Sequence, residues 1–162
     1  MAQGKLTALP LGLLLAALFF GLSGCGSGRA ASGTQRVEIG GETFVLELAL
    51  TRQARYQGLS DRASIPRDGG MLFVFPREDH REFVMRRCLV PIDILFLKPS
   101  GEVMAAHAMA VEPYDAQDLP RYASGGPSSL AVELAGGTIE RLGLKVGDRI
   151  SLPVLELKRR AL

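Results

Sequence analysis

The chain has 162 residues and contains no tryptophan, two cysteines and two histidines. A structural zinc site needs about four Cys or His ligands at characteristic spacings, so the sequence predicts no metal site. Two cysteines allow no disulfide framework. Neither sign of charge dominates, because 19 Lys and Arg face 17 Asp and Glu, giving a net charge of +2. This balance, without basic blocks interleaved with aromatics, predicts no nucleic-acid partner.

What the chain does have at its N-terminus is an apolar run. Lys5 precedes a run over residues 6–21 that is too short to cross a bilayer, a pattern typical of a secretory signal peptide. The run leads into Leu22-Ser23-Gly24-Cys25, which resembles the bacterial lipobox. In that motif, the residue matching Cys25 is lipidated and becomes the first residue of the mature protein. The alternative is an ordinary cleaved leader in which Cys25 has no such role.

The lipobox interpretation divides the chain into four parts. Residues 1–24 are the signal peptide, 25–35 the lipidated cysteine and a flexible Gly- and Ser-containing tether, 36–155 a single β domain, and 156–162 a short, solvated basic tail. The lipid on Cys25 anchors the exported protein at the periplasmic face of a membrane. Gly26 lacks the aspartate associated with inner-membrane retention, which favours the outer membrane where one exists.

Short apolar segments separated by Gly and Pro turns dominate the mature chain. They predict a mainly β fold, an antiparallel sandwich or barrel with two short helices, over residues 52–57 and 138–142. Residues 112–129 are predicted to form a long loop. The predicted strands are residues 37–39, 44–50, 71–75, 82–87, 92–98, 102–111, 130–134 and 149–154.

Five motifs in a fixed order resemble the bacterial and archaeal family called Domain of Unknown Function 192. The resemblance covers about residues 37–154. It implies a compact, jelly-roll-like β domain, often exported, with no established activity and no cofactor. The motifs are Gly58-Leu59-Ser60-Asp61-Arg62, Gly70-Met71-Leu72-Phe73-Val74-Phe75, Pro91-Ile92-Asp93-Ile94-Leu95-Phe96, Glu133-Leu134-Ala135-Gly136-Gly137-Thr138 and Gly143-Leu144-Lys145-Val146-Gly147-Asp148-Arg149.

One segment departs from the family pattern. Members usually carry Phe-Trp-Met-Lys-Asn-Thr where this chain has Phe83-Val84-Met85-Arg86-Arg87-Cys88. Val84, Arg87 and Cys88 replace the tryptophan, asparagine and threonine, and Arg86 keeps only the charge of the lysine. Since Arg and Lys differ in geometry and donor layout, a site on this segment would be altered here.

Two carboxylates are the candidate catalytic residues. Asp93 lies in an apolar strand and needs a partner or solvent, which suggests a polar end of the domain where Asp93, Arg86 and Glu133 bind a ligand. Were Asp93 and Glu133 adjacent, they would suit acid–base chemistry. The alternatives are a structural ion pair or turn cap for Asp93 and a solvent-facing position for Glu133.

The predicted long loop supplies two further candidate ligand-binding residues. Tyr122 offers a ring for stacking, and Ser124 opens a Gly-rich stretch whose backbone N–H groups suit an anion, although a plain connecting loop is the alternative. Cys88 follows two arginines that would lower its pKa. A small apolar residue at the end of a strand is the alternative for Cys88.

Together these features favour a non-enzymatic binding or accessory module, displayed on a membrane by its lipid. Its partner would be a small molecule, a glycan or a protein of the cell envelope. Two other functions stay open at this point. One is an envelope hydrolase using Asp93 and Glu133 with Arg86, and the other is a structural subunit of an envelope complex.

Overall fold

The computed structural model describes Met1 and residues 33–162. The predicted signal peptide, Cys25 and most of the predicted tether therefore lie outside the described residues. Within the part of the chain that the structure describes, no helix is long and apolar enough to cross a membrane.

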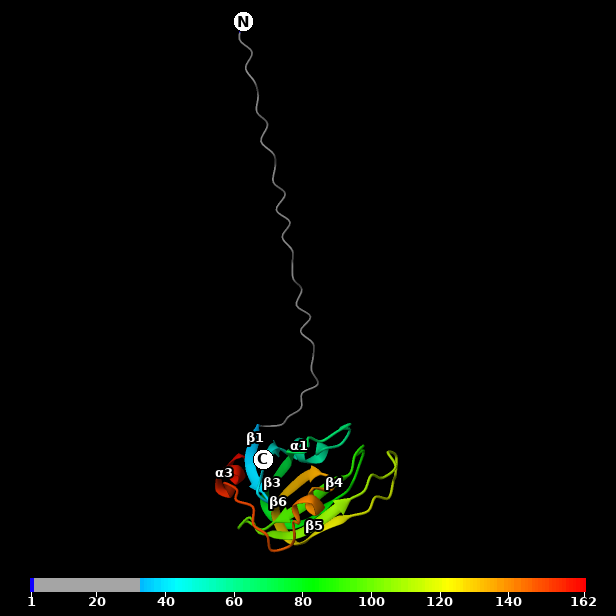
Figure 1. The fold of residues 1–162 in the computed structure, drawn as a ribbon, viewed down its shortest axis with the longest axis vertical. Coiled ribbons are helices and arrows are strands. Elements are labelled where there is room, and N and C mark those ends of the chain that lie inside the picture. Colours follow the sequence, from blue (N-terminus) through cyan, green and yellow to red (C-terminus); the bar gives the residue numbers. More distant parts are fainter. Residues whose placement is uncertain (2–32) are drawn as a thin grey trace.

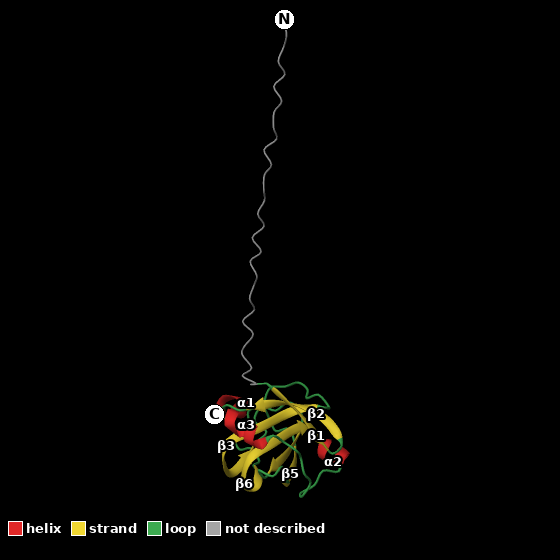
Figure 2. Cartoon of the chain, turned by 90° about the vertical axis from the view of Figure 1, so that its left-hand side faces the viewer, coloured by secondary structure: helices red, strands yellow, loops and turns green. Residues whose placement is uncertain are grey.

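Residues 33–162 fold around one six-stranded sheet with the strand order β1-β2-β3-β6-β4-β5 (Figures 1 and 2). Three short helices accompany it. The elements are β1 (Thr34–Ile39), β2 (Glu42–Ala49), α1 (Arg52–Gln57), β3 (Gly69–Phe83), β4 (Ile92–Leu97), β5 (Val103–Met109), β6 (Tyr122–Ala135), α2 (Thr138–Leu142) and α3 (Val154–Arg160).

The mainly β class is confirmed, but the predicted antiparallel sandwich or barrel is corrected. The sheet is mixed, because β2 and β3 run parallel, and it is not closed into a barrel. The parallel pair arises because α1 and the loop after it carry the chain back to the start of the next strand. The helix α1 forms over the predicted residues 52–57, and Thr51 caps it by accepting a hydrogen bond from the Ala54 N–H at 3.1 Å.

The largest departure from the predicted elements is a long two-stranded arm. Residues 71–75 and 82–87 were predicted as separate strands and 112–129 as a loop, yet β3 runs unbroken through Pro76 and pairs with β6 as far as Tyr122. Register shifts interrupt this pairing between Val74 and Asp79 and between His80 and Glu82. Such irregularities accommodate proline and glycine, which the sequence pattern indicates only as turns.

Both faces of the sheet are buried, each against its own apolar cluster. The first cluster joins alternate strand residues to the C-terminal part of the chain, including Leu144, Ile150 and Leu157. The second cluster packs Met71, Phe73, Ile94 and Phe96 against residues from α1, the loop after it and the segment after β3. This burial explains the almost wholly apolar sequences of the central strands.

The residues predicted as a short basic tail lie mostly in a helix. Residues 154–160 form α3, in which Leu157 is completely buried while Arg159 and Arg160 are exposed. The guanidinium of Arg55 donates to the carbonyl oxygens of Leu50, Val74 and Leu162 at 2.7, 2.9 and 2.6 Å. The end of the chain is thereby fixed beside α1 and β3, with Figure 1 showing α3 and the C-terminus on the same side as β1.

Candidate functional site

A cavity of about 330 Å³ lies between α1 and the second face of the sheet. We call it the Glu133 pocket, after the carboxyl group that reaches it from β6. Its lining includes an aromatic cluster, in which Phe73 and Phe83 make an edge-to-face contact at 5.0 Å between ring centroids and Phe75 lies 6.4 Å from Phe83. The rest of its lining includes Tyr56, Gly58, Ser60, Val84, Cys88 and the charged residues Arg52, Arg55, Glu82 and Arg86.

Glu133 is a buried carboxyl group with an incomplete set of hydrogen bonds. It pairs with Met71 of β3 and Ile94 of β4 in the sheet, and only 6% of the residue is exposed. The Leu59 N–H lies near the carboxyl group, yet Oε2 has no hydrogen-bond partner among the described residues. Burial raises the pKa of Glu133 to about 8, although the Arg62 charge and the Leu59 N–H act in the opposite direction. The carboxyl group is therefore mostly protonated at neutral pH.

The space above this carboxyl group depends on Gly58. This residue ends α1 with a φ of 52°, in the left-handed region that favours glycine. A Cβ built at Gly58 would lie 3.5 Å from the Phe73 ring and 3.7 Å from Glu133 Oε2. The missing side chain thus leaves both groups facing the cavity.

Positive charges surround the pocket. Arg86 donates to the Tyr56 carbonyl oxygen and holds its guanidinium 3.7 Å from the centroid of the Tyr56 ring, in cation–π geometry. Arg62, whose side chain is only 12% exposed, forms a two-point ion pair with Glu47 of β2, with an Nη2–Oε2 distance of 2.7 Å. Because Glu47 compensates much of the charge of Arg62, Glu133 is left without a dedicated counter-ion.

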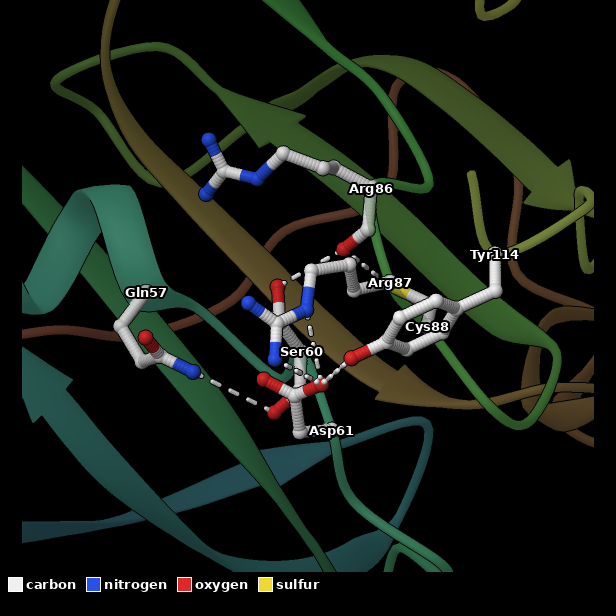
Figure 3. A network of polar contacts seen from close by, with 7 residues as sticks. All are labelled: Gln57, Ser60, Asp61, Arg86, Arg87, Cys88 and Tyr114. Carbon is white, nitrogen blue, oxygen red and sulfur yellow. Dashed lines mark hydrogen bonds and ion pairs between the residues drawn. The ribbon is translucent and has the colours of Figure 1, made fainter. Parts of the chain in front are cut away.

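A polar network fixes the wall between α1 and the segment after β3 (Figure 3). The Arg87 guanidinium and the Tyr114 hydroxyl both donate to Asp61 Oδ1, at 2.9–3.0 and 3.2 Å. The Ser60 hydroxyl donates to the Arg86 carbonyl at 2.8 Å. Asp61 and Arg87 both have a positive φ, 61° and 54°, a strained conformation that these contacts hold in place.

Cys88 lines the pocket as a buried thiol, with 7% of the residue exposed. Burial, reinforced by the nearby Glu133, raises the pKa of the thiol to about 11, although Arg86 acts in the opposite direction. The thiol is protonated at neutral pH and lacks the thiolate character of a reactive cysteine. The interpretation of Cys88 as a small packing residue therefore fits the structure, and a lowered pKa does not.

The comparisons with known proteins identify the family of this domain. The family model of Domain of Unknown Function 192, described as an uncharacterized ACR, matches residues 35–152. The chain belongs to this family. None of the curated proteins compared with it matches.

Two solved structures resemble this Domain of Unknown Function 192 protein. One is a proposed transcription regulator from Sinorhizobium meliloti, 33% identical, with a TM-score of 0.62 over 72% of this chain and 89% of that one. The other is a protein of unknown function from Novosphingobium aromaticivorans, 30% identical, with a TM-score of 0.63 over 74% of this chain and 84% of that one.

The carboxylate pair considered from the sequence does not form in this family member. Asp93 lies opposite Leu134 in the sheet, whereas Glu133 lies opposite Ile94, so the two side chains leave opposite faces. Asp93 is 1% exposed and accepts a hydrogen bond from the Ile139 N–H in the first turn of α2 at 2.6 Å. It is a buried helix-capping carboxylate, and the prediction that it converges with Arg86 and Glu133 is wrong.

The other predicted ligand-binding residues also separate. Ser124 is buried, donates to the Gly126 carbonyl at 2.6 Å and accepts from the Arg81 N–H at 3.0 Å, so it serves the β3–β6 arm. Tyr122 packs beside His107, with ring centroids 5.8 Å apart, and does not line the Glu133 pocket. Among the described residues, Arg86 and Glu133 of the predicted set line the same cavity. The solvent-facing alternative for Glu133 is wrong, because only 6% of the residue is exposed.

Sequence reasoning missed the contribution of α1 and the loop after it. Gly58 and Leu59 of this segment line the cavity with Glu133, and the charge of Arg62 acts on the Glu133 carboxyl group. They belong to the motif Gly58-Leu59-Ser60-Asp61-Arg62, which was used only to recognise the family. Its dense polar and glycine content next to a short helix was the available signal for a site.

The hydrogen bond between Asp93 and α2 is expected to stabilise the fold. Asp93→Ala leaves the Ile139 N–H without its charged acceptor and should lower the free energy of unfolding by about 2 kcal/mol. Asp93→Asn, which keeps an acceptor oxygen, should cost clearly less. Urea denaturation of both variants measures the difference. Equal losses would show that the hydrogen bond to α2 is not the source of the effect.

Proposed function

We propose that this protein is an exported lipoprotein whose Domain of Unknown Function 192 domain binds a small molecule in the Glu133 pocket. The observation that carries the proposal is the buried Oε2 of Glu133, which faces a cavity without a partner among the described residues. A buried polar group left unpaired costs roughly 1–3 kcal/mol, and a ligand that pairs with it recovers this cost.

The size and lining of the cavity support a ligand of about one ring. A dry cavity of about 150 Å³ is enough to hold benzene, so about 330 Å³ accommodates a ring with a polar substituent. Aromatic walls with a few polar groups are typical of small-molecule sites. Phe73 and Phe83 supply such walls, and Glu133 supplies the polar group that orients the ligand.

Binding is a better proposal than hydrolysis for this site. The hydrolase hypothesis pairs Glu133 with Asp93, and Asp93 lies on the other face of the sheet. The other carboxylate at the pocket, Glu82, is paired with Arg121 at 3.0 Å. The proposed regulatory role of the relative from Sinorhizobium meliloti is not carried over, because the near-balanced charge of this chain, with 19 basic and 17 acidic side chains, does not favour a nucleic-acid partner.

Equilibrium dialysis with benzamide tests the pocket. The full chain in detergent should bind this neutral probe, and Cys88→Met, whose longer side chain extends into the cavity, should weaken binding at least fivefold. Leu89→Met places the same side chain at the exposed neighbouring position and should change nothing. Circular dichroism confirms that both variants fold. Equal binding by both variants would mean that the probe binds elsewhere.

The lipid anchor has its own test. In cells that process lipoproteins, the membrane fraction should contain a chain that starts at Cys25 and carries added acyl mass. Cys25→Ser should abolish that mass. A mature chain that starts elsewhere, or that starts at Cys25 without acyl mass, would contradict the lipoprotein proposal.

A further inference from the structure

We propose that the ligand of the Glu133 pocket is a small organic acid, an apolar or aromatic ring that carries a carboxylate. This inference rests on the proposed function and adds the chemical class of the ligand. Two independent features support it. One is the hydrogen-bonding state of Glu133, and the other is the set of charges around the cavity.

The first feature is the direction in which Glu133 can hydrogen-bond. Oε2 is buried beside Gly58 and has no hydrogen-bond partner among the described residues. A protonated carboxyl group carries one O–H donor, and on the cavity side no protein group competes with a ligand for it. Glu133 then presents a donor to the cavity, and the ligand must supply an acceptor. Carboxylate oxygens accept such O–H groups in short, strong hydrogen bonds.

The second feature is the excess of positive charge around the cavity. Three guanidinium groups line it, those of Arg52, Arg55 and Arg86. The only other charged lining residue besides Glu133 is Glu82, which is paired with Arg121 at 3.0 Å. A protonated Glu133 adds no negative charge. Arg55 uses its N–H groups on backbone carbonyls, but its charge remains and favours an anion nearby.

The aromatic walls define the body of the ligand. Phe73 lies beside Gly58 at the inner end of the cavity, and Phe75 and Phe83 continue the apolar surface toward the arginines. A ring in contact with these side chains places its substituent within reach of Glu133 or of the positive charges. A compact arylcarboxylate combines both requirements, and benzoate is the simplest probe of this class.

Glu133 should make the binding of such an acid depend on pH. Above pH 8 the ionised carboxylate no longer donates, and it repels the ligand. Other charged and titratable groups surround the Glu133 carboxyl group. Arg62 acts on it from the loop after α1 and is paired with Glu47 of β2. The remaining groups line the cavity and are Arg52 and Arg55 of α1, Glu82 of β3, and Arg86 and Cys88 after β3. Cys88 stays protonated through this range because its pKa is about 11.

Equilibrium dialysis with three probes of one shape tests the inference. Benzoate, benzamide and benzamidine share a planar ring and differ in charge. For the full chain in detergent at pH 6.5, benzoate should bind at least threefold more tightly than benzamide, and benzamidine most weakly. At pH 9 benzoate should bind about tenfold more weakly, since about a tenth of Glu133 remains protonated. Benzamidine should bind more tightly at pH 9 than at pH 6.5.

Substitutions test the hydrogen-bonding role of Glu133 and the positive charges around the cavity separately. Glu133→Gln should remove the pH dependence of benzoate binding. Arg52→Gln should weaken benzoate binding several-fold more than it weakens benzamide binding, whereas Arg36→Gln, at an exposed position of β1 outside the pocket, should affect neither.

Other results would contradict specific parts of the proposal. If benzamide or benzamidine binds most tightly at pH 6.5, the acid class is wrong while the binding pocket stands. If benzoate keeps its pH dependence in Glu133→Gln, Glu133 is not the group that selects it. If none of the probes binds at either pH, the proposed binding function itself falls.

Discussion

Replacing Glu133 with glutamine is expected to stabilise the protein by up to about 5 kcal/mol at pH 9 and to leave its stability nearly unchanged at pH 4. In the unfolded chain this carboxyl group ionises around its ordinary pKa of 4.5, whereas in the fold its pKa is about 8. Between these values the unfolded state releases a proton that the folded state keeps. The free energy of unfolding of the wild type therefore falls as pH rises from about 4.5 to 8, at up to 1.36 kcal/mol per pH unit, and then levels off.

Urea denaturation of the wild type and Glu133→Gln at several pH values between 4 and 9 measures this effect. The two stability curves should separate as pH rises, because the amide has no proton to lose. Glu38→Gln, at an exposed carboxylate of β1, removes one acidic group without removing a buried one and should follow the wild type. Parallel curves for wild type and Glu133→Gln would show that Glu133 ionises normally, and the carboxyl group would then not present a donor to the cavity at neutral pH.

A second large effect is expected at Gly70, where β3 passes the backbone of Glu133. A Cβ built at Gly70 would lie 2.2 Å from the Glu133 carbonyl oxygen. Backbone of a central strand can give way only by breaking the β3–β6 hydrogen bonds that carry the sheet. Gly70→Ala should therefore lower the free energy of unfolding by about 3–5 kcal/mol, at the upper end of the range for single substitutions.

Gly125→Ala provides the matched control. Gly125 has a φ of 73°, yet a Cβ there meets no atom within 4 Å. Its replacement should cost only the conformational strain of about 1–2 kcal/mol. Denaturation midpoints of the two variants separate clash from strain. If Gly70→Ala were no more destabilising than Gly125→Ala, β3 and β6 would not be held as closely as the structure indicates.

The sequence predictions are correct for elements that depend on a local residue pattern. The strand predicted over residues 44–50 forms as β2, and the helices predicted over residues 52–57 and 138–142 form as α1 and α2, because these patterns depend on neighbours within a few positions. The β3–β6 arm escaped prediction because its strand character comes from pairing across about fifty residues. Proline and glycine disfavour a strand in a local sequence pattern. The irregular pairing between β3 and β6 accommodates them in the folded protein.

The candidate site also depends partly on local sequence and partly on the tertiary structure. The sequence by itself determined the family and the mainly β class, and it singled out Glu133 and Arg86 as candidate residues of one site. Only the tertiary structure decided that Asp93 and Glu133 lie on opposite faces, because that depends on which residues of β4 and β6 face each other. Tertiary structure likewise decided that α1 and its loop cover Glu133. Burial is a property of everything packed around a carboxyl group, and it is burial that keeps Glu133 protonated.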